Sequence, residues 1–331
     1  MHIHFLEGEQ RLQVNSRKQR FCFVLILFLC FLQFPARAQV QDQPSQAPGV
    51  IKVDVNLVLL DATVKTKAGK IMGDLTQESF QLREDGVPQR IEVFSKDELP
   101  INVALVLDLS DSIGPFLGPL RDAANLALSS LKQDDEVALF TFSTEAELRV
   151  PFTNDKSAIA KQINEFKVGG ATNINDGIFI ASKYLLNLPP KGRRVIILIS
   201  DDVGTSAGGQ GTNDIITETI AADATLYNLK IPGYNPPGTL IAAAMVPGLV
   251  NIHKVAEQTG GEIFDVQDVA HLTDVFRALI ERIKTRYTLG YYTQATAASG
   301  KPHKLDVTLS PSYGKKVKDY LILSKSSYYV H

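Results

Sequence analysis

The feature that most constrains the fold is a regular alternation of apolar runs and amphipathic segments between residues 101 and 286. Two of the runs, Ile101–Leu109 and Arg194–Ser200, are apolar at almost every position, which is typical of parallel strands covered on both faces. The segments between the runs place apolar residues at helical spacing, as at Leu120, Ala124 and Leu128. This alternation predicts an α/β fold built on a doubly wound, mostly parallel sheet.

Two proline-containing segments interrupt this alternation. Ala146–Phe152 carries Pro151, which is tolerated at the border of a sheet, so we predict an edge strand. Pro232–Gly248 is rich in proline and glycine, and we predict a mobile surface loop rather than a folded element.

The segments on either side of the α/β region carry strand patterns instead. Residues 51–66 partly alternate and are rich in β-branched side chains, and Asp85–Gly86 is a strong hairpin signal within residues 80–94. We therefore expect a small all-β unit at residues 51–99 and a C-terminal β segment at residues 287–331. The pattern leaves open whether the two segments join in one sandwich or stay separate.

The first 38 residues have the layout of a secretory signal peptide. Basic residues precede the apolar run Phe21–Phe34, and the small residues Ala36 and Ala38 predict cleavage before Gln39. An anchor that is retained in the membrane is the alternative, but the run is shorter than the ~20 residues that a spanning helix needs. Residues 39–50 are interpreted as a linker. We expect a secreted or periplasmic protein without a stable membrane span after cleavage.

Cysteine content and net charge exclude several classes of protein. Both cysteines, Cys22 and Cys30, lie in the predicted leader, so the mature protein is expected to have no disulfide, thiolate metal site or cysteine nucleophile. The formal net charge of −2 lacks the basic excess of general nucleic-acid binders, and no nucleic-acid partner is expected.

Hydroxyl and carboxylate side chains gather where the predicted central strands end. Asp108, Ser110 and Ser112 follow one strand, Asp201 follows another, and Thr172 precedes a predicted helix. In a doubly wound sheet, functional groups collect beyond the carboxyl ends of the strands. A site made of oxygen donors without histidine or cysteine selects Mg²⁺, Ca²⁺ or Mn²⁺.

The chemistry of these five side chains favours the capture of a ligand over a closed structural site. Ser110 and Ser112 could bind the cation directly, and Asp108 and Asp201 would supply charge, partly through waters. Thr172 would complete the set of oxygen ligands around the cation, or a water molecule would take its place. Because three of the five donors are neutral, the cation would be under-neutralised and open at one position. An aspartate or glutamate carboxylate of a protein partner would fill that position.

In order and position, these residues resemble the metal-ion-dependent adhesion site of von Willebrand factor type A (VWA) domains. The resemblance rests on DLSDS at Asp108–Ser112, ATN around Thr172 and ISD ending at Asp201, and it covers about Ile101–Arg286. It implies a Rossmann-like domain at residues 100–286, with cation binding by the five residues and capture of an acidic ligand. The flanks resemble those of a bacterial subgroup of secreted relatives. The resemblance therefore implies an adhesion protein that is not an enzyme.

Two positions depart from the pattern of that family. Asp111 and Asp202 stand where family members often carry glycine. Their charge could tighten cation binding or favour Ca²⁺, and it could also repel an acidic ligand. Taken individually, both are interpreted as solvated loop carboxylates. In relatives the site is coupled to movement of the last helix, which corresponds here to His271–Thr285.

Three alternatives remain open at the level of the sequence. The DLSDS stretch could be a capped turn without metal, and Thr172 could be only the N-cap of the next helix. The stretch GTSAG at Gly204–Gly208 fits a nucleophile motif, so a hydrolase that uses the metal or Ser206 is a second function, although a long glycine-rich loop follows the motif. A structural module of an envelope assembly is the third.

Overall fold

A computed structural model describes residues 56–96, 100–188, 192–295, 300–312 and 319–330. The predicted signal peptide, the linker and residues 51–55 of the predicted β unit lie outside the described residues. Within the described part of the chain, no helix has both the length and the apolar character needed to cross a membrane.

The described elements follow the predicted alternation. The strands are β1 (Asn56–Thr66), β2 (Phe80–Glu84), β3 (Val87–Gln89), β4 (Val93–Ser95), β5 (Ile101–Asp108), β6 (Glu136–Phe142), β7 (Ala146–Thr153), β8 (Arg193–Ser200), β9 (Ala224–Lys230), β10 (Ile263–Asp265), β11 (Tyr287–Thr293), β12 (His303–Leu309), β13 (Tyr320–Ser324) and β14 (Ser327–Tyr328). The α-helices are α1 (Leu117–Ser130), α2 (Lys156–Glu165), α3 (Ile174–Leu186), α4 (Thr212–Ala221), α5 (Thr239–Ala244), α6 (Ile252–Thr259) and α7 (Leu272–Lys284). Short 3₁₀ turns are η1 (Gln77–Ser79), η2 (Asp111–Phe116) and η3 (Val269–His271).

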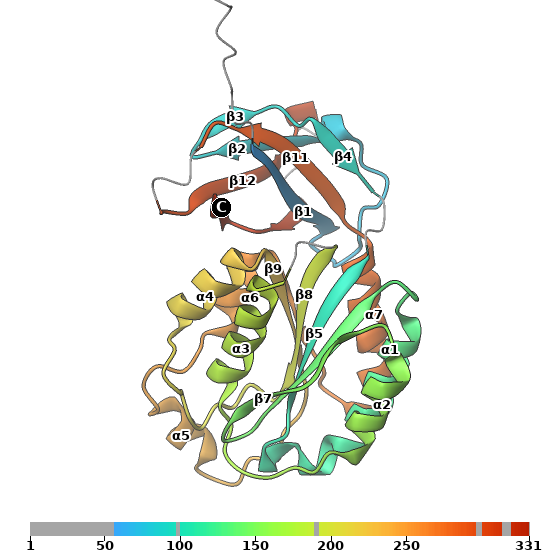
Figure 1. The fold of residues 1–331 in the computed structure, drawn as a ribbon, viewed down its shortest axis with the longest axis vertical. Helices are drawn as coiled ribbons and strands as arrows, with labels where there is room; N and C mark the ends of the chain where they lie inside the picture. The colour runs from blue at the N-terminus through green and yellow to red at the C-terminus, as the bar shows by residue number, and fades with distance from the viewer. Residues whose placement is uncertain (1–55, 97–99, 189–191, 296–299, 313–318, 331) are drawn as a thin grey trace, which may run out of the picture. The chain divides into compact units, whose positions relative to one another are not determined.

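A six-stranded sheet with the strand order β10-β9-β8-β5-β6-β7 forms the centre of the α/β region (Figure 1). Its neighbouring strands are parallel except for β6 and β7, which are antiparallel. The predicted doubly wound, mostly parallel sheet is confirmed. The predicted edge strand is confirmed as β7, at the border of the sheet.

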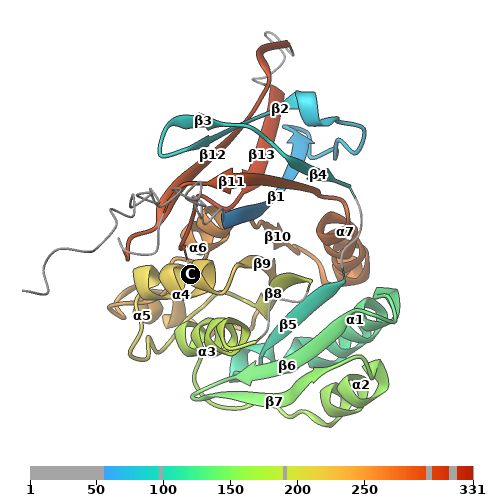
Figure 2. The same cartoon turned by 45° about the horizontal axis from the view of Figure 1, so that its top comes forward.

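Helices cover both faces of this sheet (Figure 2). Helices α1, α2 and α7 pack on one face, and α3, α4 and α6 pack on the other. Successive side chains of a strand point to opposite faces, so Val103 and Leu105 join the first core while Ala104 and Val106 join the second. All eight residues of β5 are buried, which explains why this strand is a continuous apolar run.

The strands outside the α/β region form two antiparallel sheets, with the orders β13-β1-β11-β4 and β14-β12-β2-β3. Strand β1 pairs with β11, with Leu60 opposite Leu289, and β2 pairs with β12, with Leu82 opposite Val307. Each sheet thus combines strands that precede the α/β region with strands that follow it. A third apolar core, which includes these four residues, lies between the sheets.

The hairpin predicted at Asp85–Gly86 connects β2 to β3. Both turn residues have left-handed backbones, with φ of 49° at Asp85 and 84° at Gly86. Such angles suit the two-residue turns that match the twist of paired strands.

Replacing Gly86 with alanine is expected to destabilise the protein by about 1 kcal/mol, because its φ of 84° is strained for any residue with a Cβ. Gly118 provides the matched control, since it lies in α1 and a Cβ there would meet no heavy atom within 4 Å. Gly118→Ala should leave stability unchanged or raise it by up to about 1 kcal/mol. Urea unfolding measures both changes, and equal effects would contradict the argument.

The prediction of a loop throughout Pro232–Gly248 is wrong, because this segment contains α5. The run Thr239–Ala244 includes several good helix formers, and Ala243 is buried against the rest of the domain. Composition favoured a loop because the prolines and glycines lie outside the helix, at both ends of the segment.

Candidate metal centre

Asp108 and Asp201 lie at the edge of the six-stranded sheet that is formed by the carboxyl ends of its parallel strands. Strands β5 and β8 are parallel neighbours in which Leu107 is paired with Ile199, so their carboxyl ends lie side by side. The chain leaves β5 for β6 on one side and later returns to β8 on the other. The edge beyond β5 is therefore a topological switch point, the place where open α/β sheets bind ligands.

The carboxylate of Asp108 is wholly buried at this edge. Its Oδ1 accepts a hydrogen bond from the backbone N–H of Ser110 at 2.9 Å, and its Oδ2 accepts one from Ser200 Oγ at 2.6 Å. Burial raises the pKa of Asp108 to about 6, and the charge of Asp201 acts in the same direction, while the hydrogen bonds from Ser110 and Ser200 oppose the shift. Two acidic groups are thus close enough to affect each other.

The hydroxyls of Ser110 and Ser112 face each other in the turn that follows β5. Their Oγ atoms are 3.2 Å apart, within hydrogen-bonding distance. Ser110 is buried and Ser112 is half-buried, whereas Asp111 between them is exposed, as predicted. Ser110 has an extended backbone, with φ of −65° and ψ of 165°, and turn η2 begins only at Asp111. In extended backbone, alternate side chains lie on the same side.

Thr172 lies between the loops that follow β5 and β8. The residue two positions earlier, Gly170, accepts a hydrogen bond from Asp111 N at 3.3 Å, and the carbonyl of Thr172 accepts bonds from Thr205 N at 2.9 Å and Ser206 N at 3.1 Å. The N-cap of α3 is Asn173, whose side chain accepts from the backbone N–H of the third helical residue. The alternative role of Thr172 as the N-cap is therefore wrong.

Asp201 and Asp202 have different partners. Asp201 accepts hydrogen bonds from Val203 N at 3.1 Å and from Asn235 Nδ2 at 3.2 Å. Both carboxylate oxygens of Asp202 accept from Nδ2 of the buried Asn228, at 3.0 and 2.8 Å, and burial raises the pKa of Asp202 to about 7. The interpretation of Asp202 as a solvated carboxylate is wrong, because its side chain is bound to a residue of β9.

Asp108 and Asp201 have no basic partner among the described residues, whereas the charge of Lys230 acts on Asp202 to lower its pKa, against the larger effect of burial. Within the described ranges, no lysine, arginine or histidine forms an ion pair with Asp108, Asp201 or Asp202. A buried carboxylate without a counter-charge is costly, and a divalent cation would supply that charge. The described residues contain no metal-binding group of three or more His, Cys, Asp or Glu. A site here would consist of two carboxylates and three hydroxyls, a donor set that fits a hard cation.

Three residues that shape this edge are not among the five predicted ligands. Ser200 donates to Asp108, and its position before the ISD aspartate was an available signal. Asn235 donates to Asp201 from a segment that was expected to be a loop, so no local pattern pointed to it. A Cβ at Gly233 would lie 1.8 Å from Asp201 Oδ2, so only glycine allows this close approach.

Residues 103–204 match the sequence profile of the von Willebrand factor type A domain, and this span includes all five candidate ligands. This region is a VWA domain. No curated protein matches the sequence.

Several solved structures resemble the chain. An aerotolerance-related membrane protein of Bacteroides fragilis is 16% identical, with a TM-score of 0.40, over 55% of this chain and 99% of that one. A von Willebrand factor type A protein of Catenulispora acidiphila is 15% identical, with a TM-score of 0.44, over 61% and 48%. The von Willebrand factor domain of a type V pilus tip protein of Porphyromonas gingivalis is 12% identical, with a TM-score of 0.38, over 56% and 96%.

Ser206 does not occupy a nucleophile elbow in the VWA domain. Strand β8 ends at Ser200 and α4 begins only at Thr212, so Ser206 lies in the middle of a loop rather than at a tight turn between strand and helix. In the part of the chain that the structure describes, no hydrogen bond joins the Ser206 hydroxyl to a histidine.

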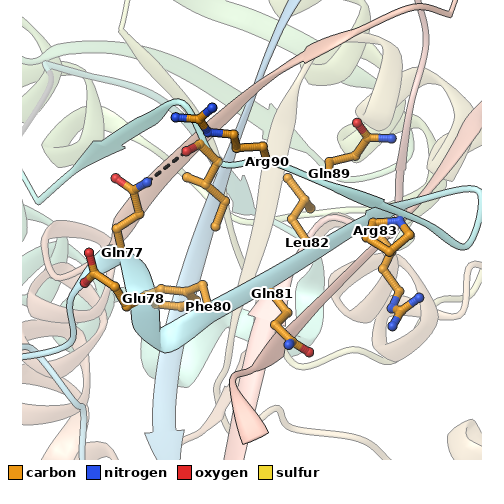
Figure 3. Close-up of a pocket in the computed structure, with 10 residues that line it drawn as sticks. Gln77, Glu78, Phe80, Gln81, Leu82, Arg83, Gln89 and Arg90 are labelled. Carbon is orange, nitrogen blue, oxygen red and sulfur yellow. Dashed lines mark hydrogen bonds between the residues drawn. The ribbon is translucent and has the colours of Figure 1, made fainter. Parts of the chain in front are cut away.

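A separate hollow of about 360 Å³ lies outside the VWA domain, beside β2 and β3 (Figure 3). Gln77 spans one side of it by donating from Nε2 to the carbonyl of Ile91 at 2.8 Å. Its charged side chains, Glu78, Arg83 and Arg90, are all exposed. This hollow therefore presents solvated groups, in contrast to the buried carboxylates of the VWA domain.

Proposed function

We propose that the VWA domain binds a divalent cation, Mg²⁺ or alternatively Ca²⁺ or Mn²⁺, and captures an acidic side chain of a protein partner through it. The proposed ligands are Asp108, Ser110, Ser112, Thr172 and Asp201. We further propose that the protein acts in the periplasm or outside the cell, in line with the predicted signal peptide, and that it is a binding protein without enzymatic activity.

The observation that carries this proposal is the environment of Asp108. Its carboxylate is wholly buried next to Asp201, and neither residue has a basic partner within the described ranges. A bound cation would supply positive charge to this edge and attract an anionic ligand. Three of the five proposed donors are neutral hydroxyls, and both oxygens of Asp108 already share their charge with N–H and O–H donors. The cation would therefore retain enough charge to attract a carboxylate of another molecule.

Calorimetric titration of the purified protein with Mg²⁺, Mn²⁺ and Ca²⁺ tests cation binding. We expect one cation per chain, bound at millimolar concentration or below for at least one of the three metals. A pull-down from an envelope extract in Mg²⁺, compared with one in chelator, tests capture of a partner. Absence of heat with every metal would contradict the proposal. Metal binding without any Mg²⁺-dependent partner would favour a structural module.

A fluorophosphonate probe should leave Ser206 unlabelled, because no histidine of the described ranges hydrogen-bonds to this hydroxyl to activate it. Mass spectrometry of the probe-treated protein measures the result, and a Ser206→Ala variant serves as the control. Labelling of the protein that is lost in this variant would establish a serine hydrolase and contradict the assignment as a binding protein.

A further inference from the structure

Exposed apolar side chains concentrate in the segment between β9 and α6. Four large ones, Tyr234, Leu240, Ile241 and Met245, are 63%, 61%, 67% and 78% exposed. On α5 and its C-cap, Leu240, Ile241 and Met245 lie within one broad arc, while Ala243 on the opposite side is buried. We call these four residues the α5 platform. Several large apolar side chains exposed on one short segment of a folded domain favour an interaction site there.

The α5 platform is attached directly to the candidate metal centre. Tyr234 N donates to the carbonyl of Ser112 at 2.8 Å, and Asn235 Nδ2 donates to Asp201 at 3.2 Å. In Figure 1, α5 lies toward the same end of the six-stranded sheet as the teal turn that follows β5. The residues that precede α5 therefore contact both halves of the proposed site.

The C-terminal end of this segment, near Gly248, is also hydrogen-bonded to the rest of the domain. The side chain of Asn175, which is wholly buried, donates to the carbonyl of Gly248 at 2.8 Å and accepts from Val250 N at 3.0 Å. Leu249 packs so closely on Gly204 that a Cβ there would lie 2.8 Å from it. Attachment at both ends fixes the platform beside the site, so its apolar side chains are presented in a defined position.

We infer that the α5 platform seats apolar side chains of the same partner segment that presents its carboxylate to the cation. This inference rests on the proposed function and specifies its partner as a protein segment in which leucine- or phenylalanine-like residues flank an acidic one. The single contact between a cation and a carboxylate is the same for any acidic residue, so discrimination must come from neighbouring groups. Burial of apolar side chains of the partner against those of the platform provides this discrimination.

The charge of the segment supports a protein segment over an anionic membrane surface. Between Ile231 and Ile252 the sequence contains no Lys, Arg, His, Asp or Glu. Helices that bind anionic membrane surfaces carry lysine or arginine beside their apolar face, and this segment has none. An uncharged platform beside a cation complements a ligand that is apolar apart from one acidic group.

An array of pentapeptides with a central aspartate tests the inference. The flanking residues are varied among Gly, Ser, Lys, Leu and Phe, and binding of the purified full chain is measured in Mg²⁺ and in chelator. We expect Leu- and Phe-flanked peptides to bind about tenfold more tightly than Gly-flanked ones in Mg²⁺. A variant with Leu240→Ser, Ile241→Ser and Met245→Ser should lose this preference while its calorimetric Mg²⁺ affinity is unchanged.

A control variant with Leu57→Ser and Leu321→Ser removes exposed leucines of β1 and β13, which are 45% and 43% exposed, and it should keep the preference. Equal binding of Leu- and Gly-flanked peptides by a protein that binds Mg²⁺ would overturn the platform but not the cation site. Absence of Mg²⁺ binding would overturn the proposed function itself. Self-association in sedimentation that is lost only in the platform variant would show that a second copy is the occupant, and would also overturn the inference.

Discussion

Asparagine in place of Asp108 is expected to abolish cation binding while the fold is retained. Asparagine has nearly the same volume as aspartate, and its amide can still pair with the Ser110 N–H and the Ser200 hydroxyl that now bind the carboxylate. It removes the buried negative charge that a divalent cation would neutralise. We expect the affinity for Mg²⁺ and Mn²⁺ to fall at least about 100-fold in calorimetric titrations, with an unchanged circular dichroism spectrum.

The matched control is Asp134→Asn, which removes one negative charge from an exposed position just before β6, at the opposite edge of the sheet from Asp108. This variant should bind cations as the unaltered protein does. In chelator, Asp108→Asn should melt at the same temperature as the unaltered protein or higher, because it no longer buries an unpaired charge. Full cation affinity in Asp108→Asn would contradict the assignment of this residue as a ligand.

Alanine in place of Arg286 is expected to lower the free energy of unfolding by about 3–5 kcal/mol. The Arg286 side chain is 2% exposed and lies between α7 and β11. Its guanidinium donates to the carbonyl of Gly260 at 3.0 Å, Thr225 Oγ1 at 3.3 Å and Asp61 Oδ2 at 3.4 Å, and its central carbon lies 5.3 Å from the ring centre of Tyr227.

The expected loss in the free energy of unfolding is large because Arg286→Ala leaves a carboxylate without its partner. Asp61 would lose its basic partner, because its other hydrogen bond comes from the neutral hydroxyl of Thr288 at 3.0 Å. The contact also joins β1 to the chain that leaves the VWA domain, so its loss weakens the packing between residues far apart in the sequence. A buried charge that loses its partner costs much more than the net value of the pair.

Arg277→Ala is the matched control, since Arg277 lies on α7 and pairs with Asp274 at 2.8 Å with both side chains largely exposed. Solvent-exposed pairs contribute little, and we expect a change within about 0.5 kcal/mol. Urea unfolding in chelator measures both variants without any contribution from metal. Equal losses would mean that Arg286 stabilises the fold no more than a surface ion pair does.

Local patterns were enough to predict the elements that depend on neighbouring residues. The two-sided apolar run of β5 indicated a central strand, because each face of that strand needs its own apolar partner. Asp85–Gly86 predicted the hairpin, because this dipeptide tolerates two left-handed residues. Gly260, with φ of 77°, ends α6, and a glycine after a helical pattern is a local signal of such an end.

The candidate site was predictable in part for the same reason. Parallel strands have their carboxyl ends at one edge, so the aspartate that ends β5 and the one that follows β8 had to lie near each other. The partners of these groups were not predictable. Asn235 reaches Asp201, and Asn228 binds Asp202, from positions with no local relation to the motif. Binding of a cation stays a prediction that the titrations will decide.

The sequence by itself determined the class of fold, the hairpin and the edge at which the acidic and hydroxyl groups meet, because periodicity, turn chemistry and strand direction are local properties. Only the tertiary structure decided that β1 pairs with β11, that α5 forms within a proline-rich segment, and that this segment binds the turn at Ser112. Those outcomes depend on contacts between residues far apart in the chain, whose free energies no local pattern encodes.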